Sequence, residues 1–211
     1  PGARTEREVV RAIAAAEASQ RALDIWLHEH EPVDPATPSA LPGWTVGHVL
    51  THIARNADSV RSMLAGQPQY PGGAAQRDAD IEAGARRPWE QLVADVAASG
   101  AALAAVWSLP RDWSGSAQAL RGSRPLRLIP ALRRREIEVH RADLGLGYTF
   151  ADMPADFVRY EVVQMEMLWR ASRPMGLTPL PAAALAASPP VRLAWLFGRA
   201  EIEGLGPAGI F

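Results

Sequence analysis

Four long stretches of the chain carry apolar residues at helical spacing, and short polar or proline-rich segments separate them. The stretches cover residues 5–30, 45–64, 76–108 and 129–144, and Pro88 breaks the third of them and can begin a renewed helix. Within each stretch the apolar residues recur every three or four positions, which places them on one face of an α-helix. Four amphipathic helices of this length predict a mainly α protein, in which the apolar faces pack against one another as a four-helix bundle.

The segments outside these four stretches predict smaller elements. Residues 113–125 lack a helical period and predict a loop or a small hairpin. After residue 150 the composition changes, and we expect helices near 152–171 and 190–197 and one short strand at 200–204. The predicted organisation is therefore a helical bundle over residues 1–150 and a small C-terminal module over residues 151–211, either α/β or mostly helical.

Composition restricts the classes of function. The chain has 211 residues and a formal net charge of -1, which predicts neither a nucleic-acid partner nor a membrane-surface partner. We find no membrane-length apolar run and no signal-peptide pattern, and we expect a soluble, cytoplasmic protein that is a monomer or a weak dimer. The sequence contains no cysteine, so any thiol chemistry must come from a bound small molecule.

Two of the predicted helices carry metal-binding residue types four positions apart. His48 and His52 form the first pair, and Glu136 and His140 form the second. A spacing of four places each pair on one helix face, and two imidazoles with a carboxylate are suitable ligands for a divalent metal. Glu138 is the poorer carboxylate candidate because it lies about 200° around the helix from His140.

Spacing alone does not decide which of these residues bind a metal. Either His48 or His52 satisfies the pattern, and a histidine in a bundle often makes an ordinary hydrogen bond instead of binding metal. Glu136 lies among four arginines, at positions 133, 134, 135 and 141, so it could equally form an exposed ion pair. From spacing, the residues indicate a metal site but do not define its ligands.

Two segments resemble the signatures of a known family. Residues 41–57 begin Leu-Pro-Gly-Trp-Thr-Val-Gly-His and resemble the N-terminal signature of the mycothiol-dependent maleylpyruvate isomerase family. Residues 135–145 contain Arg-Glu, a histidine four positions after the glutamate, and Asp-Leu-Gly, and they resemble its second signature. The resemblance covers about residues 5–150 and implies a DinB-like metal-binding four-helix bundle.

The resemblance also implies a set of site residues. It identifies His52, Glu136 and His140 as metal ligands, with zinc the usual ion, and it leaves His48 outside the ligand set. It implies cofactor-binding or orienting roles for Asn56 and Asp143. A weaker match over residues 195–199 implies a catalytic role for Arg199.

The expected function is that of a metal-dependent enzyme that uses a low-molecular-weight thiol. The resemblance implies mycothiol as the cosubstrate and a small electrophilic or dicarboxylate substrate, in a cis–trans isomerisation or an S-transfer. Two alternatives stay open: a hydrolase in which zinc activates water, and a non-catalytic DinB-like metal-binding stress protein. A fourth protein ligand, such as His48, would favour the non-catalytic alternative.

Overall fold

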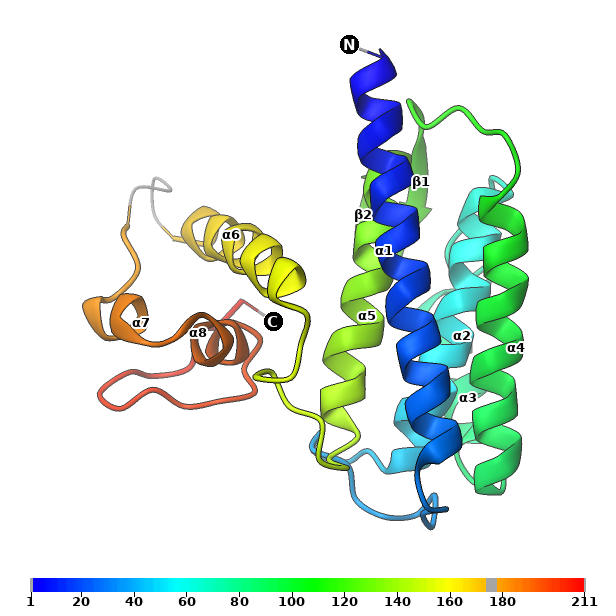
Figure 1. The fold of residues 1–211 in the computed structure, drawn as a ribbon, viewed down its shortest axis with the longest axis horizontal. Coiled ribbons are helices and arrows are strands. Elements are labelled where there is room, and N and C mark those ends of the chain that lie inside the picture. Colours follow the sequence, from blue (N-terminus) through cyan, green and yellow to red (C-terminus); the bar gives the residue numbers. More distant parts are fainter. Residues whose placement is uncertain (1, 174–177, 211) are drawn as a thin grey trace. The chain divides into compact units, whose positions relative to one another are not determined.

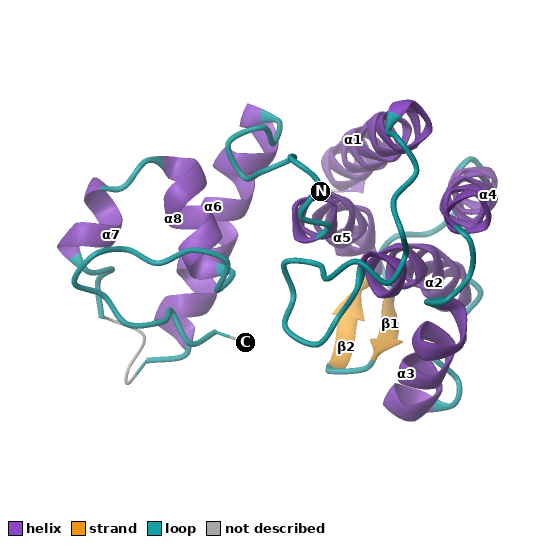
Figure 2. Ribbon diagram, turned by 90° about the horizontal axis from the view of Figure 1, so that it is seen from below, coloured by secondary structure: helices purple, strands orange, loops and turns teal. Residues whose placement is uncertain are grey.

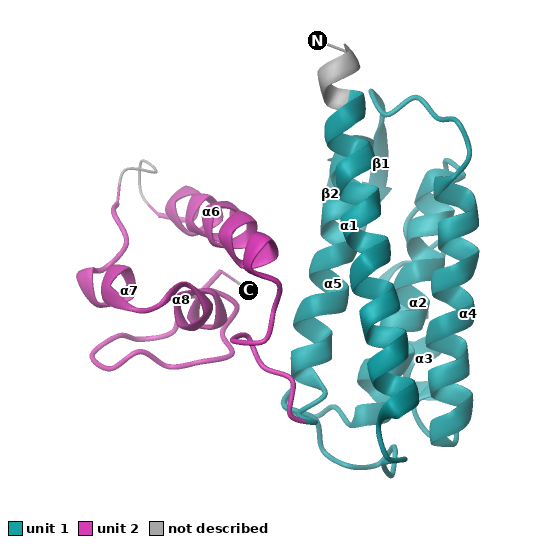
Figure 3. Ribbon diagram, viewed as in Figure 1, with its two compact units in different colours: residues 1–146 teal, residues 147–211 magenta. Residues whose placement is uncertain are grey.

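The computed structural model describes residues 2–173 and 178–210, with side chains from residue 6 onward. By its contacts the chain divides into two compact units, residues 1–146 and 147–211 (Figure 3). Among the described residues, no helix combines the length and the apolar character needed to cross a bilayer.

The first unit contains five α-helices, a two-stranded sheet and a short 3-10 helix (Figure 1). Its elements are α1 (Gly2–Glu29), α2 (Val46–Leu64), α3 (Gly73–Gly84), α4 (Trp89–Trp107), β1 (Ser116–Ala119), β2 (Gly122–Pro125), η1 (Leu126–Leu128) and α5 (Ile129–Asp143). Helices α1, α2, α4 and α5 form the bundle, in which α1 lies beside α5 and α2 lies beside α4 (Figure 2). The prediction of a mainly α protein with a four-helix bundle is confirmed.

The helical stretch over 76–108 is divided at Pro88 into two helices, as the predicted break at this proline indicates. Helix α3 ends at Gly84, and α4 begins directly after Pro88, which occupies its N-cap position. Helix α3 packs on the outside of α2 and does not belong to the four-helix core (Figure 2). A separate α3 matters for function because it brings its side chains close to the N-terminal half of α2.

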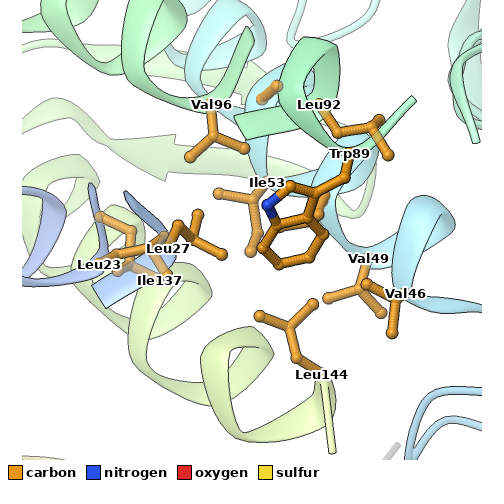
Figure 4. Packing of buried hydrophobic residues seen from close by; sticks show 12 residues of the cluster. Leu23, Leu27, Val46, Val49, Ile53, Trp89, Leu92, Val96, Ile137 and Leu144 are labelled. Atoms are coloured by element: carbon orange, nitrogen blue, oxygen red, sulfur yellow. The ribbon is translucent and has the colours of Figure 1, made fainter. Parts of the chain in front are cut away.

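The core of the bundle is made of aliphatic side chains from all four helices and the aromatic side chain of Trp89 (Figure 4). Leu23 of α1, Ile53 of α2, Leu92 of α4 and Ile137 of α5 are fully buried there. Burial of each such side chain contributes about 1.5–3 kcal/mol. This packing fixes α2 beside α5, which are the two helices that carry the candidate metal ligands.

Strands β1 and β2 form an antiparallel hairpin that connects α4 to α5. Ser116 pairs with Pro125 and Ala119 with Gly122, so the turn consists of two residues. Gly122 has a φ of 93°, a left-handed value that glycine adopts without steric cost. Of the two structures considered for residues 113–125, a loop or a small hairpin, the hairpin is present.

The described part of the second unit consists of helices and loops. Its helices are α6 (Ala155–Ala171), α7 (Ala182–Ala186) and α8 (Pro189–Leu196), and α6 packs against α8. The strand predicted at residues 200–204 is wrong, because these residues form a bend, a turn and irregular backbone. A single alternating run has no neighbouring strand to bond with, and an isolated strand is not stable. The described residues of this unit thus lack the β element of the α/β alternative.

The first turn of α2 lies too close to the α3–α4 connection to accept a larger residue at position 47. A Cβ added to Gly47 would lie 1.9 Å from the carbonyl oxygen of Ala85. We expect Gly47→Ala to lower the free energy of unfolding by at least about 1–3 kcal/mol, because backbone atoms would have to move. Urea unfolding followed by circular dichroism measures this loss.

Gly115→Ala is the matched control. Its Cβ would make only an ordinary contact of 3.4 Å with the Leu126 side chain. The control should keep the wild-type free energy of unfolding within about 0.5 kcal/mol. Equal stability of the two variants would show that the α3–α4 connection moves freely away from α2.

Candidate metal centre

Three polar side chains from α2 and α5 converge on one point. The Nε2 atom of His52 lies 3.0 Å from Oε2 of Glu136, and Nε2 of His140 lies 3.4 Å from the same oxygen. Glu136 and His140 are one turn apart on α5, and His52 faces them from α2. The structure thus brings together the three residues that the family resemblance implies as ligands.

The donor set fits a divalent metal ion. One nitrogen from each histidine and one carboxylate oxygen all lie within 4.8 Å of one another. Two imidazole nitrogens and a carboxylate oxygen are a common set of protein ligands in catalytic zinc sites. Within residues 2–173 and 178–210 this is the one group of histidine and acidic side chains with such geometry. Metal binding by these residues stays a prediction.

The pKa values of the three side chains are shifted in different directions by burial and by their neighbours. Burial, together with the positive charge of His140, lowers the pKa of His52 to about 4. Burial also acts to lower the pKa of His140, but hydrogen bonds with Asp143 and Glu136 outweigh it and raise that pKa to about 9. Burial would raise the pKa of Glu136, yet its hydrogen bonds with both histidines hold it well below the usual range. At neutral pH, therefore, His52 is neutral, Glu136 is ionised and His140 holds a proton that a metal ion would replace.

Asp143 fixes the orientation of the His140 ring. Its Oδ2 atom lies 2.9 Å from Nδ1 of His140, and its side chain is almost completely buried. A carboxylate in this position accepts the Nδ1–H bond, so Nε2 is directed toward Glu136. Carboxylate–histidine pairs of this kind orient the ligands of metal sites and increase their basicity.

His48 makes different contacts from His52, although the two histidines share a helix face. Its Nδ1 accepts a hydrogen bond from the backbone N–H of Thr45 at 3.2 Å, and its Nε2 lies 3.0 Å from Oε2 of Glu82. His48 therefore caps the N-terminus of α2 and contacts α3. It is absent from the convergent group, which removes the fourth protein ligand considered from the sequence.

Asn56 lies one turn after His52 and binds Arg133. The Asn56 Oδ1 atom accepts a hydrogen bond of 2.8 Å from the guanidinium of Arg133. Arg133 is only 2% exposed, so it is not the partner in an exposed ion pair, the alternative that the sequence left open for Glu136. The signal for its burial was available in the sequence, since Arg133 lies four positions before Ile137 and seven before His140 on one helix face.

Arg199 lies in the second unit, after α8. Its guanidinium donates a hydrogen bond of 2.8 Å to the carbonyl oxygen of Phe197. The catalytic role that the resemblance implies for Arg199 stays a prediction.

Comparison with known proteins supports the fold and identifies the family. The family model described as the mycothiol maleylpyruvate isomerase N-terminal domain matches residues 16–145. A crystal structure of a mycothiol-dependent maleylpyruvate isomerase is 21% identical to this chain, with a TM-score of 0.80. The match covers 91% of this chain and 90% of that one. A crystal structure of the H52A mutant of such an isomerase is 22% identical with a TM-score of 0.71, covering 77% and 71% of the two chains.

These structural similarities establish the DinB-like fold but, at this level of identity, nothing more specific. No curated protein matches the chain significantly. The family model, by contrast, spans more than half of the chain and includes His52, Glu136 and His140. The chain belongs to the family defined by the mycothiol maleylpyruvate isomerase N-terminal domain.

Proposed function

We propose that this protein is a metal-dependent enzyme that uses mycothiol as a cosubstrate, in a maleylpyruvate isomerase-like isomerisation or a related S-transfer. The observation that carries the proposal is the convergence of His52, Glu136 and His140 in a chain of this family. Three protein ligands are the usual number in catalytic zinc sites, which keep one coordination position for a substrate or water.

In this proposal, each residue of the candidate metal centre has a separate role. The two Nε2 atoms and the Glu136 carboxylate would hold the ion, with zinc as the first candidate. The ion would supply a positive charge that keeps a bound thiol deprotonated at neutral pH, the form in which sulfur is nucleophilic. Asp143 holds the His140 ring in its ligating orientation. The chain has no cysteine, so the thiol must be a separate molecule.

Two further residues are assigned supporting roles in this proposal. Asn56 holds the guanidinium of Arg133 beside α2, and through that contact it helps to keep the His52 turn in place. Arg199 would pair with a substrate carboxylate or with negative charge that develops on the substrate.

A panel of thiols tests the function. The zinc-loaded protein is incubated with maleylpyruvate and with mycothiol, glutathione, bacillithiol or no thiol, and the products are analysed by chromatography and mass spectrometry. We expect turnover with mycothiol and none without a thiol. The trans isomer without an adduct identifies an isomerase, and a thiol adduct identifies a transferase.

Two outcomes contradict the proposal. Hydrolysis products formed at the same rate without any thiol would indicate a hydrolase in which the metal activates water. Absence of product with every thiol, for maleylpyruvate and for a set of neutral electrophiles, would indicate a metal-binding protein without this catalytic activity.

A further inference from the structure

Trp44 lies against His52 at the end of the loop that precedes α2. The two ring centroids are 5.5 Å apart and the planes meet at 63°, which is an edge-to-face contact. Backbone hydrogen bonds hold the tryptophan in place: its N–H donates to the Leu41 carbonyl, and its own carbonyl accepts from Ser39. Trp44 therefore marks a fixed surface beside the candidate metal centre.

Arg77 of α3 brings a positive charge to this surface. Its guanidinium carbon lies 5.8 Å from the centre of the Trp44 ring, within the range of a cation–π contact. Its charge also contributes to the lowered pKa of His52, after burial and the charge of His140. The Arg77 side chain is 25% exposed and pairs with the neighbouring, more exposed Asp78 at 2.6 Å. Exposed pairs of this kind are weak, so an anion can replace Asp78.

Tyr70 places a buried hydroxyl in the same region. The residue is 8% exposed, and its hydroxyl has no hydrogen-bond partner of good geometry among the described residues. Burial raises its pKa, hydrogen bonding with Ser59 and Arg77 and the charge of Arg77 lower it, and the charge of Glu136 raises it. The hydroxyl thus lies next to Arg77. A buried hydroxyl whose hydrogen bonds to the protein are poorly aligned has lost its hydrogen bonds to water, and a ligand oxygen would restore one.

We propose that Arg77 and Tyr70 form a carboxylate subsite beside the three candidate metal ligands, and that this subsite selects electrophiles that carry an anionic group. The planar guanidinium suits a carboxylate, because it donates parallel hydrogen bonds. The charges agree with this assignment. The two positive charges of a divalent ion would be balanced by Glu136 and Asp143, so an anion would compete for Arg77 with its exposed partner Asp78. The role of this subsite in catalysis rests on the proposed function, whereas the subsite itself is a proposal about anion binding.

Binding of maleate to the zinc-loaded full-length chain tests the subsite without any thiol or turnover. Isothermal titration calorimetry compares the wild type with Arg77→Met, Arg77→Lys and Tyr70→Phe. The matched control is Arg86→Met, which removes the same charge from a side chain just after α3 that is 88% exposed. Zinc content and thermal stability are measured for each variant.

We expect Arg77→Met to weaken maleate binding by about 10-fold or more and Arg77→Lys to weaken it less, since hydrogen bonds to charged groups are among the stronger ones. Arg86→Met should bind maleate within about twofold of the wild type, because exposed charges are screened. Tyr70→Phe should weaken binding several-fold and lower stability by less than about 1 kcal/mol, because the hydroxyl it removes makes no well-aligned hydrogen bond among the described residues. The neutral diester dimethyl maleate should show no dependence on Arg77.

Three results would overturn the proposal: wild-type protein that does not bind maleate, equal weakening by the Arg77→Met and Arg86→Met variants, or unchanged binding in Arg77→Met at full zinc content. If Arg77→Met loses zinc, Arg77→Lys decides. Weaker maleate binding at full zinc content then supports the subsite, and unchanged binding contradicts it. Failure of the thiol panel would refute the proposed function and leave these binding results unaffected.

Discussion

His52→Ala is expected to abolish stoichiometric zinc binding and, with it, thiol-dependent turnover. The substitution removes one of three ligand atoms that lie within 4.8 Å of one another, and no other described histidine joins that group. Loss of an outer partner of a metal ligand already weakens binding by about 10- to 100-fold, so loss of a ligand itself should exceed about 100-fold. Zinc per protein after dialysis, measured by atomic emission, and the rate with saturating thiol check this expectation.

His48→Ala provides the matched control, because it removes the same side chain from the same helix one turn earlier. This variant loses the contact with the Thr45 N–H and the contact with Glu82, and we expect it to lose about 1 kcal/mol of stability, as for other helix caps. Its zinc content should equal that of the wild type. Full zinc content in His52→Ala, or loss of zinc in His48→Ala alone, would refute the ligand assignment.

Arg133→Met is expected to cause the largest loss of stability, about 3–5 kcal/mol. The buried guanidinium donates to the Ile53 carbonyl at 2.9 Å, to Asn56 Oδ1 at 2.8 Å and to Gln20 Oε1 at 2.9 Å. Methionine replaces the aliphatic stem but leaves these acceptors without a donor, and each unsatisfied buried group costs about 1–3 kcal/mol. Burial lowers the pKa of Arg133 to about 10, so the side chain is still charged at neutral pH.

Urea unfolding of Arg133→Met and of Arg127→Met separates this effect from the loss of a positive charge. Arg127 lies in the short helix just before α5 and is exposed, so its replacement should change stability by less than about 0.5 kcal/mol. If both variants unfold at the same urea concentration as the wild type, the hydrogen bonds of Arg133 contribute nothing net to the bundle.

The bundle was predictable from the sequence because its helices carry long, regular apolar faces. Apolar periodicity reports burial along one element, and it therefore located α1, α2, α4 and α5. Pro88 predicted the break between α3 and α4, but the apolar pattern did not show that α3 lies outside the four-helix core, to which it contributes only the buried side chain of Ile81. The strand expected at residues 200–204 failed for a related reason, because alternation within one segment cannot supply the neighbouring strand.

The candidate site was predictable only in part. Spacing could not distinguish His48 from His52, because the difference lies in a backbone contact at the helix start. Tyr70 and Arg77 carry no local pattern. Tyr70 lies in the loop between α2 and α3, and the packing of α3 on α2 brings Arg77 over Trp44, which contacts His52. Contacts of this kind depend on tertiary structure, and local spacing does not reveal them.

Because the candidate ligands come from two helices, metal binding depends on the docking of α2 against α5. Glu136 and His140 share one turn of α5, whereas His52 is separated from Glu136 by 84 positions along the chain. An unfolded chain can present the α5 pair locally, but it gains the third ligand only when a long loop closes and α2 docks. The amount of zinc that the protein retains in competition with a chelator should therefore report how often α2 and α5 separate. The bound ion would then serve as a probe of native-state opening in this bundle.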